Sequence, residues 1–228
     1  MKTTLITMFA LICFVNANIS ANVNGQVNTN DQNKTRISDY FPDMKQDTII
    51  TSVYLWNMVD FEREIDTNLA LKYFFNNNSE EMHDIFEGYN VDENTSIYVP
   101  FVKKVHPIYR KRIDDDLYLL YYYIQSVIYL TMYDYANDKF ESTLMIGDFS
   151  DDMDVFTRST IFSNNYIVTV QSAEEAYYIL SKIDYATRRI IELKKMEVDV
   201  NQPLRKLVDD SFEALGISKE GELLEPIR

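Results

Sequence analysis

From Thr95 to Met196, short runs of β-branched and aromatic residues alternate with pairs of aspartate and asparagine. Such runs favour strands, and the polar pairs favour tight turns between them. The pattern therefore predicts a mainly β protein built as an antiparallel meander. The expected strands are Ser96–Val105, Leu117–Ile124, Val127–Tyr135, Lys139–Ile146, Ser159–Ser163, Tyr166–Gln171, Tyr177–Tyr185 and Arg189–Met196.

The run Leu117–Tyr133 contains 17 residues without a charge, which approaches the ~20 apolar residues of a membrane-spanning helix. Six of the 17 are tyrosines, and Gln125 and Ser126 stand midway, where a tight turn would fall. These features favour a hairpin over a membrane span. Because both faces of this hairpin are apolar or aromatic, we expect it at the centre of the sheet.

Two hairpins of the meander resemble each other. Tyr129–Ala136 aligns with Ile179–Ala186 at an offset of 50 residues, and both segments end in Asp-Tyr-Ala. A strand-rich repeat of roughly 40–50 residues is typical of propeller blades, but a closed propeller needs about four of them. The sequence thus predicts a meander with two blade-like hairpins and leaves open whether the sheet closes.

Short elements precede the meander. Ile49–Trp56 alternates as a strand does, and Asn68–Phe75 has the pattern of a short helix. A second short helix is expected between Ser79, a good N-cap, and Gly88, a good terminator. The C-terminal part returns to helix at 203–215, where an apolar stripe is followed by Gly216.

Residues 1–21 predict a cleavable secretory signal, since Lys2 is followed by the apolar run Leu5–Val15 and then by small and polar residues. Cleavage fits after Ala17 or after Ala21, and we favour Ala21. The asparagine-rich segment 22–36 is then expected to be a flexible leader. A single β-rich domain would follow at 37–228, a length that one hydrophobic core can support.

The only cysteine, Cys13, lies inside the predicted signal, so the mature chain would have no thiol. Because Ile12 rather than a small residue precedes it, a lipoprotein is the less favoured alternative. Loss of the signal removes one lysine and no acid, which changes the net charge from −14 to −15. Such acidity disfavours nucleic acid as a partner. The protein is therefore expected in the periplasm, at the cell surface or outside the cell, without a membrane span after signal removal.

Few residues offer recognisable catalytic chemistry. His83 and His106 are the only histidines, and the chain has no Gly-x-Ser-x-Gly motif and no glycine-rich phosphate loop. We therefore assign no catalytic residue and no cofactor. The 36 acidic residues keep a carboxylate-dependent hydrolase, such as a glycosidase, as an alternative.

One acidic loop has some character of a calcium site. Asp148, Asp152 and Asp154 stand at alternating positions with Ser150, as oxygen ligands do in a calcium loop. However, Met153 occupies the place where an EF-hand requires glycine. A solvated turn is the favoured interpretation, and calcium remains the alternative cofactor.

Two surfaces are candidates for binding. Lys103, Arg110, Lys111 and Arg112 belong to a basic stretch in an otherwise acidic chain, expected to form a turn beside a strand, which either pairs with nearby acids or holds an acidic partner. The tyrosines of the central hairpin, Tyr121 and Tyr123 among them, suit protein or sugar contacts if exposed, although burial is the more common state of such residues.

The function expected from these observations is that of an exported, non-catalytic binding or structural protein of the cell envelope or extracellular space, with a protein or a glycan as its partner. The secreted hydrolase is the second hypothesis. A small outer-membrane barrel is the third and least favoured, because the central hairpin is apolar on both faces.

Overall fold

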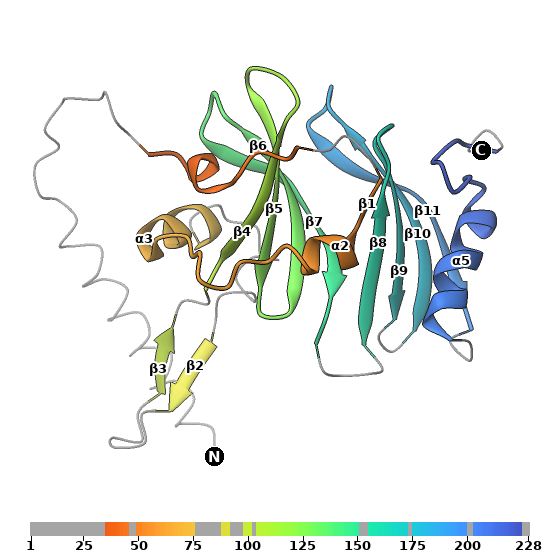
Figure 1. Ribbon diagram of the computed structural model, residues 1–228, viewed down its shortest axis with the longest axis horizontal. Coiled ribbons are helices and arrows are strands. Elements are labelled where there is room, and N and C mark those ends of the chain that lie inside the picture. Colours follow the sequence, from red (N-terminus) through yellow and green to blue (C-terminus); the bar gives the residue numbers. More distant parts are fainter. Residues whose placement is uncertain are drawn as a thin grey trace, which may run out of the picture. The chain divides into compact units, whose positions relative to one another are not determined.

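The structure is a computed structural model that describes residues 35–45, 49–75, 88–91, 98–101, 104–150, 155–172, 175–199 and 203–224. Apart from Thr35, they belong to one compact unit, Arg36–Arg228. An antiparallel meander sheet dominates this unit, and short helices accompany it (Figure 1). The predicted fold class, mainly β with a C-terminal helix, is confirmed.

Nine strands form the main sheet of the described residues, and eight of them lie in sequence order from β4 to β11, while β1 pairs with β8. The seven strands β5–β11 agree with the prediction to within three residues. Two more, β2 (Gly88–Val91) and β3 (Tyr98–Phe101), pair only with each other. The sheet strands are β1 (Ile50–Thr51), β4 (His106–Arg112), β5 (Leu117–Ile124), β6 (Val127–Asp134), β7 (Lys139–Asp148), β8 (Phe156–Ile161), β9 (Tyr166–Ser172), β10 (Ala176–Asp184) and β11 (Arg189–Val198).

Strand β4 corrects the sequence prediction, which ends a strand at Val105 and places a turn in the basic stretch. His106–Arg112 is extended and pairs with β5. Pro107 concealed this strand, because proline cannot donate to a ladder and argues against a strand in a sequence pattern. It is tolerated because β4 is the end strand of the meander and because the register with β5 shifts between Pro107 and Tyr109.

The segment Ile49–Trp56 is a strand over only two residues, so the prediction of a full strand is wrong. Ile50 and Thr51 pair with β8, and the chain then enters helix α2 (Ser52–Trp56). The Thr51 side chain accepts a hydrogen bond from the backbone N–H of Tyr54 at 3.1 Å. The Tyr54 N–H, which would bond to a neighbouring chain in a strand, is thus satisfied by this N-cap, and the helix starts here.

The uncharged run forms the β5–β6 hairpin, as predicted. Its turn residues Gln125 and Ser126 have φ angles of 43° and 68°, as a two-residue type I′ turn requires. Leu120 lies in one hydrophobic cluster and Tyr121 in another, so both faces of the hairpin are covered. No helix in the described ranges has the length and apolar character needed to cross a bilayer.

The sheet divides into two halves between β7 and β8. These strands pair only through Gly147 and Asp148, and further along β8 pairs with β1 instead. A side chain at Gly147 would place its Cβ 3.0 Å from the Cβ of Ser52, so glycine lets α2 approach the junction closely. The sheet is not closed, and a propeller is not confirmed.

Three hydrophobic clusters hold the halves and the helices together. We call the middle one the inner core: it joins Leu55 of α2 and Ile108 of β4 to Ile161 and Ile183 of the second half. A second cluster joins the first half to η1 (Ile37–Tyr40), α3 (Thr67–Ala70) and η2 (Leu71–Phe75). A third joins the second half to α5 (Leu204–Leu215), which packs against β9 and β10.

The helix predictions at 68–75 and 203–215 are confirmed by α3 with η2 and by α5. Gly216 ends α5 in the left-handed conformation, with φ of 74°, which is the usual role of glycine after a helix. The helix predicted from Ser79 lies outside the described residues.

The two Asp-Tyr-Ala segments lie in the β6–β7 and β10–β11 turns. Asp134 and Asp184 each accept a hydrogen bond from the backbone N–H three residues later. Asp138 and Arg188 both have φ of 55°. The two turns are also in contact, because Arg188 donates to the Asp134 carboxylate. The similar segments therefore form similar turns, and an ion pair between them connects the two halves of the sheet.

Candidate functional site

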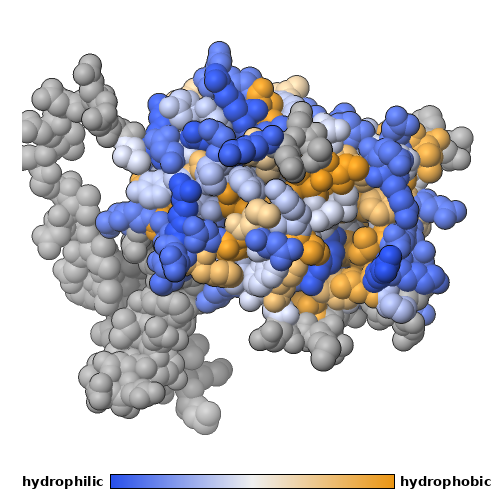
Figure 2. Space-filling view, viewed as in Figure 1, coloured by the Kyte–Doolittle hydropathy of each residue, from blue (hydrophilic) through white to orange (hydrophobic). Residues whose placement is uncertain are grey.

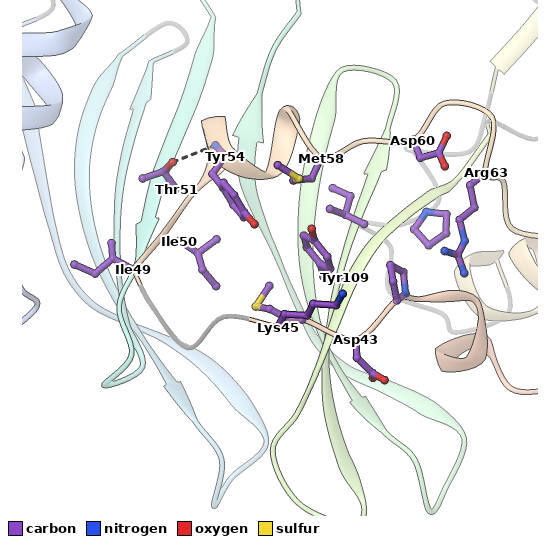
Figure 3. A pocket seen from close by; sticks show the side chains of 14 residues that line it. Asp43, Lys45, Ile49, Ile50, Thr51, Tyr54, Met58, Asp60, Arg63 and Tyr109 are labelled. Carbon is purple, nitrogen blue, oxygen red and sulfur yellow. Dashed lines mark hydrogen bonds between the residues drawn. The ribbon is translucent and has the colours of Figure 1, made fainter.

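A pocket of about 530 Å³ opens along β4, between that strand, the segment leading into α2, and the loop 58–63 (Figure 3). We call it the β4 pocket. Its volume falls within the roughly 300–1,000 Å³ of typical small-molecule sites. Residues from four separate parts of the chain line it, and no sequence motif marks them.

Backbone pairing on the outer edge of β4 frames the pocket. Met44 donates its N–H to the carbonyl of Arg110 at 2.8 Å, and Arg110 donates to the carbonyl of Pro42 at 2.9 Å. At the other end, Ile65 donates to the carbonyl of Val105 at 2.9 Å. The stretch of β4 between these contacts borders the pocket, which is thus held open by paired segments on both sides.

Apolar side chains form the floor and part of the rim. Ile50 and Ile108 are buried and belong to the inner core. Ile49 and Met58 are 44% and 41% exposed. Of the seven large apolar side chains that are exposed in the described residues, four lie between 49 and 61. Figure 2 shows apolar patches among polar ones over the middle of the face that carries α2.

Two tyrosines bring hydroxyl groups into the same pocket. Tyr54 comes from α2 and Tyr109 from β4. Burial raises the pKa of Tyr109, and its hydrogen bond with Tyr54 raises that pKa further. The Tyr109 hydroxyl therefore remains protonated at neutral pH and is the donor in its hydrogen bond with Tyr54.

The charges around the pocket are not equally available. Asp43 accepts from Arg110 Nε at 2.7 Å, and this hydrogen bond and the charge of Arg110 lower the pKa of Asp43. Asp60 accepts from the backbone N–H of Glu62 at 3.1 Å. Among the described residues, Lys45 and Arg63 have no ion-pair partner within 4.0 Å. In Figure 3, the Lys45 side chain extends across the pocket and the carboxylates of Asp43 and Asp60 point outward.

An aromatic cluster lies on the other side of α2. Trp56 stacks on Phe149 with ring centroids 4.7 Å apart and meets Tyr123 edge-on at 5.3 Å. Phe61 contacts both Trp56 and Tyr123 and is 53% exposed. Tyr123, a predicted binding residue, is half-buried within this cluster, whereas Tyr121, the other one, is 1% exposed and part of the inner core.

The structure places the predicted basic residues Arg110, Lys111 and Arg112 on β4. Besides Asp43, Arg110 contacts Asp39 at 3.7 Å and donates to the carbonyl of Ser38. Arg112 forms an ion pair with Asp115. The two arginines therefore bind neighbouring acids of the same chain. Lys103 lies outside the described residues.

The predicted calcium loop is described only in part. Asp148 ends β7 and accepts from the backbone N–H of Ser150 at 2.9 Å, as in a turn. Asp152 and Asp154 lie outside the described residues. Within the described ranges, no three His, Cys, Asp or Glu side chains are grouped so that they could hold a metal ion.

A polar cluster that the sequence did not reveal joins η2 to the β6–β7 turn. The Asp138 carboxylate accepts from Lys72 at 2.8 Å and from Tyr133 at 2.6 Å, and it also accepts from Tyr73. Burial opposes ionisation of Asp138, but these three donors lower its pKa. Burial raises the pKa of both tyrosines. Fixed protonation states of this kind suit a structural connection.

The geometry of the β4 pocket thus combines aliphatic walls, hydroxyl groups and two cations that form no ion pair with any other residue that the structure describes. Comparison of the chain with protein-family models, with curated proteins and with solved structures finds no match.

Proposed function

We propose that this chain is an exported, non-catalytic binding protein and that the β4 pocket is its binding site. The observation that carries the proposal is the pocket itself: about 530 Å³, open to solvent, with a buried aliphatic floor and exposed Ile49 and Met58 at its rim. Export rests on the signal-like pattern of residues 1–21.

Exposed aliphatic side chains around a concave site favour binding. Ile49 and Met58 are exposed to water, although burial of apolar surface stabilises a protein by about 25 cal/mol for each Å². Grouping of such residues on one surface is typical of sites that are covered by a ligand or partner. The concentration of exposed apolar residues at 49–61 therefore supports recognition at this place.

The protonation states in the pocket support binding without catalysis. A general acid or base works best with a pKa near the operating pH. The ion pair with Arg110 moves the pKa of Asp43 down, and burial moves the pKa of Tyr109 up, so both pKa values are displaced away from neutrality. These two groups are better suited to fixed charge and to hydrogen bonding than to proton transfer.

Photocrosslinking in the cells that produce the protein tests the proposal. The photoreactive residue p-benzoylphenylalanine would replace Met58 at the rim and, in a matched control, Leu224, which is 60% exposed and does not line the pocket. We expect a reproducible adduct at position 58 and none at 224, and the adduct mass distinguishes a protein, a glycan and a small molecule. Equal labelling at both positions, or none at either, would refute binding at the β4 pocket.

A further inference from the structure

The charges around the β4 pocket are unevenly distributed, and their arrangement indicates the charge of its ligand. Four charged side chains line it: Asp43, Lys45, Asp60 and Arg63. Asp43 is paired with Arg110, which approaches to 2.7 Å from outside the pocket lining. Asp60 is engaged with the backbone of its own loop. In Figure 3 both carboxylates point out of the pocket and the Lys45 side chain extends across it, so the charge that a ligand meets inside is mainly positive.

A positive site is unusual on this protein, because the chain has a net charge of −14. An acidic surface repels anions in general. Local cations without acidic partners attract anions, so they favour the binding of an anion at their own position. Lys45 and Arg63 are such cations among the described residues. The Tyr109 hydroxyl already donates its only proton to Tyr54, so the two cations are the groups that recognise the anion.

The rest of the lining is aliphatic. Ile49, Ile50, Met58 and Ile108 contribute branched or flexible apolar side chains, and Met44 contributes a second thioether. Such walls bind alkyl groups by burial and do not distinguish them finely, since methionine adapts its shape to what it contacts. An inorganic anion or a sugar acid would leave this apolar surface uncovered.

We infer that the β4 pocket binds a small amphiphile with an anionic head and an aliphatic chain, the class to which medium-chain carboxylates belong. Lys45 and Arg63 hold the head, and the aliphatic walls hold the chain. This inference rests on the proposed function and narrows its ligand, in place of the protein or glycan expected from the sequence.

Calorimetric titration with three probes tests the ligand class on the purified chain without its signal: sodium decanoate, decyltrimethylammonium bromide and sodium acetate, all below micelle-forming concentrations. Decanoate is expected to bind, and decyltrimethylammonium to bind at least about tenfold more weakly because its head meets Lys45 and Arg63. Acetate is expected to show no measurable binding because it lacks the chain. Decanoate affinity should also decrease as salt is added.

Variants locate the two parts of the ligand. The double variant Lys45→Ser/Arg63→Ser should weaken decanoate about tenfold or more, whereas the control Lys206→Ser/Lys219→Ser, which changes the net charge equally on the α5 side, should stay within about twofold. Met58→Glu should abolish binding. All four lysines and arginines are exposed, and thermal unfolding checks that each variant is folded.

The outcomes separate this inference from the proposed function. Equal affinity for both decyl probes, or no effect of the Lys45/Arg63 double variant, would refute the anionic class and leave the pocket as a binding site. Absence of decanoate binding together with a photoadduct at position 58 would refute the amphiphile alone. Absence of both would refute the pocket as a binding site and the ligand class with it.

Discussion

The ion pair between Asp134 and Arg188 is expected to hold the two halves of the sheet together where their strands do not pair. Asp134 is 1% exposed, and Arg188 is 33% exposed. The same carboxylate accepts from the Asn137 backbone at 2.9 Å and from the Asn137 side chain at 2.7 Å. Burial alone would raise the pKa of Asp134, but Asn137 and Arg188 together lower it, so the carboxylate is charged in the folded protein.

The size of the effect follows from these contacts. In Asp134→Asn, the oxygen that faces Arg188 and the Asn137 amide is replaced by an amide donor, so two hydrogen bonds are lost at a buried site. Hydrogen bonds to charged groups contribute about 1.5–3 kcal/mol each, and partial exposure of Arg188 reduces this. We expect a loss of about 2–3 kcal/mol for Asp134→Asn and a coupling of about 1–2 kcal/mol with Arg188→Gln in a double-mutant cycle.

Urea unfolding followed by the fluorescence of Trp56, the single tryptophan, measures these free energies. With a slope of roughly 2–3 kcal/mol per molar urea, Asp134→Asn should lower the midpoint by about 1 M. Asp184→Asn is the matched control, because Asp184 caps the equivalent turn and forms no ion pair with a described residue of the other half. Equal losses for the two variants, or a coupling below about 0.3 kcal/mol, would refute the proposed connection.

Four further predictions use the same assay. Asp138→Ala should cost about 3 kcal/mol because it removes the acceptor of the buried hydroxyls of Tyr73 and Tyr133, whereas Asp138→Asn, which keeps an acceptor, should cost less. The pKa of Asp138 in the folded protein lies below the unfolded value of 3.8. The contribution of Asp138 to the free energy of unfolding is therefore complete above pH ~4 and should be lost as the pH falls through the folded pKa. A flat stability profile from pH 5 to about 2.5 would contradict this. Gly147→Ala should cost about 1–3 kcal/mol because its Cβ would meet the Phe149 ring at 2.7 Å and Ser52 of α2 at 3.0 Å, and an unchanged midpoint would argue against these close approaches. Ser38→Ala should raise stability by up to about 1 kcal/mol, since the buried hydroxyl has no hydrogen-bond partner in the described structure; a loss would indicate that a partner exists.

Much of the sheet could be predicted because its strands have recognisable local sequence patterns. The β5–β6 hairpin shows why: an uncharged, tyrosine-rich run with Gln125 and Ser126 at its middle has few other stable arrangements. Strand β4 could not be found in this way. Its consecutive bases and Pro107 look like a turn, and it is a strand because β5 offers it a partner, which is a tertiary reason.

Helix α2 was missed for a different reason. Ile49–Trp56 alternates as a strand does, but a single side-chain cap from Thr51 redirects the chain after two paired residues. A side-chain cap of this kind competes locally with extended structure, and the pattern of hydrophobic residues does not reveal it. The α2 error matters for function, because α2 supplies Tyr54 to the β4 pocket.

The candidate site could not be predicted at all, since its residues have no common spacing. Lys45, Tyr54, Arg63 and Tyr109 come from separate segments that meet only when β4 pairs with β5 on one edge and with residues 42–44 on the other. The sequence prediction chose the basic stretch by its charge density, and the structure shows Arg110 and Arg112 paired with acids. Lys45 and Arg63, which form no ion pair within the described part of the chain, are single residues without a recognisable sequence pattern.

The division of the sheet and the presence of the pocket have one origin. Because β8 pairs with β7 only at Gly147 and Asp148 and then continues beside β1, β1 and α2 cover the inner core. They leave it open toward β4, where Ile50 and Ile108 form the pocket floor. A ligand there would complete the inner core, so its binding must add to folding stability. At 100 times its Kd, the gain is about 2.7 kcal/mol, as large as the expected contribution of Asp134. A ligand of the β4 pocket should therefore be recognisable by a higher urea midpoint, and Met58→Glu should remove the increase.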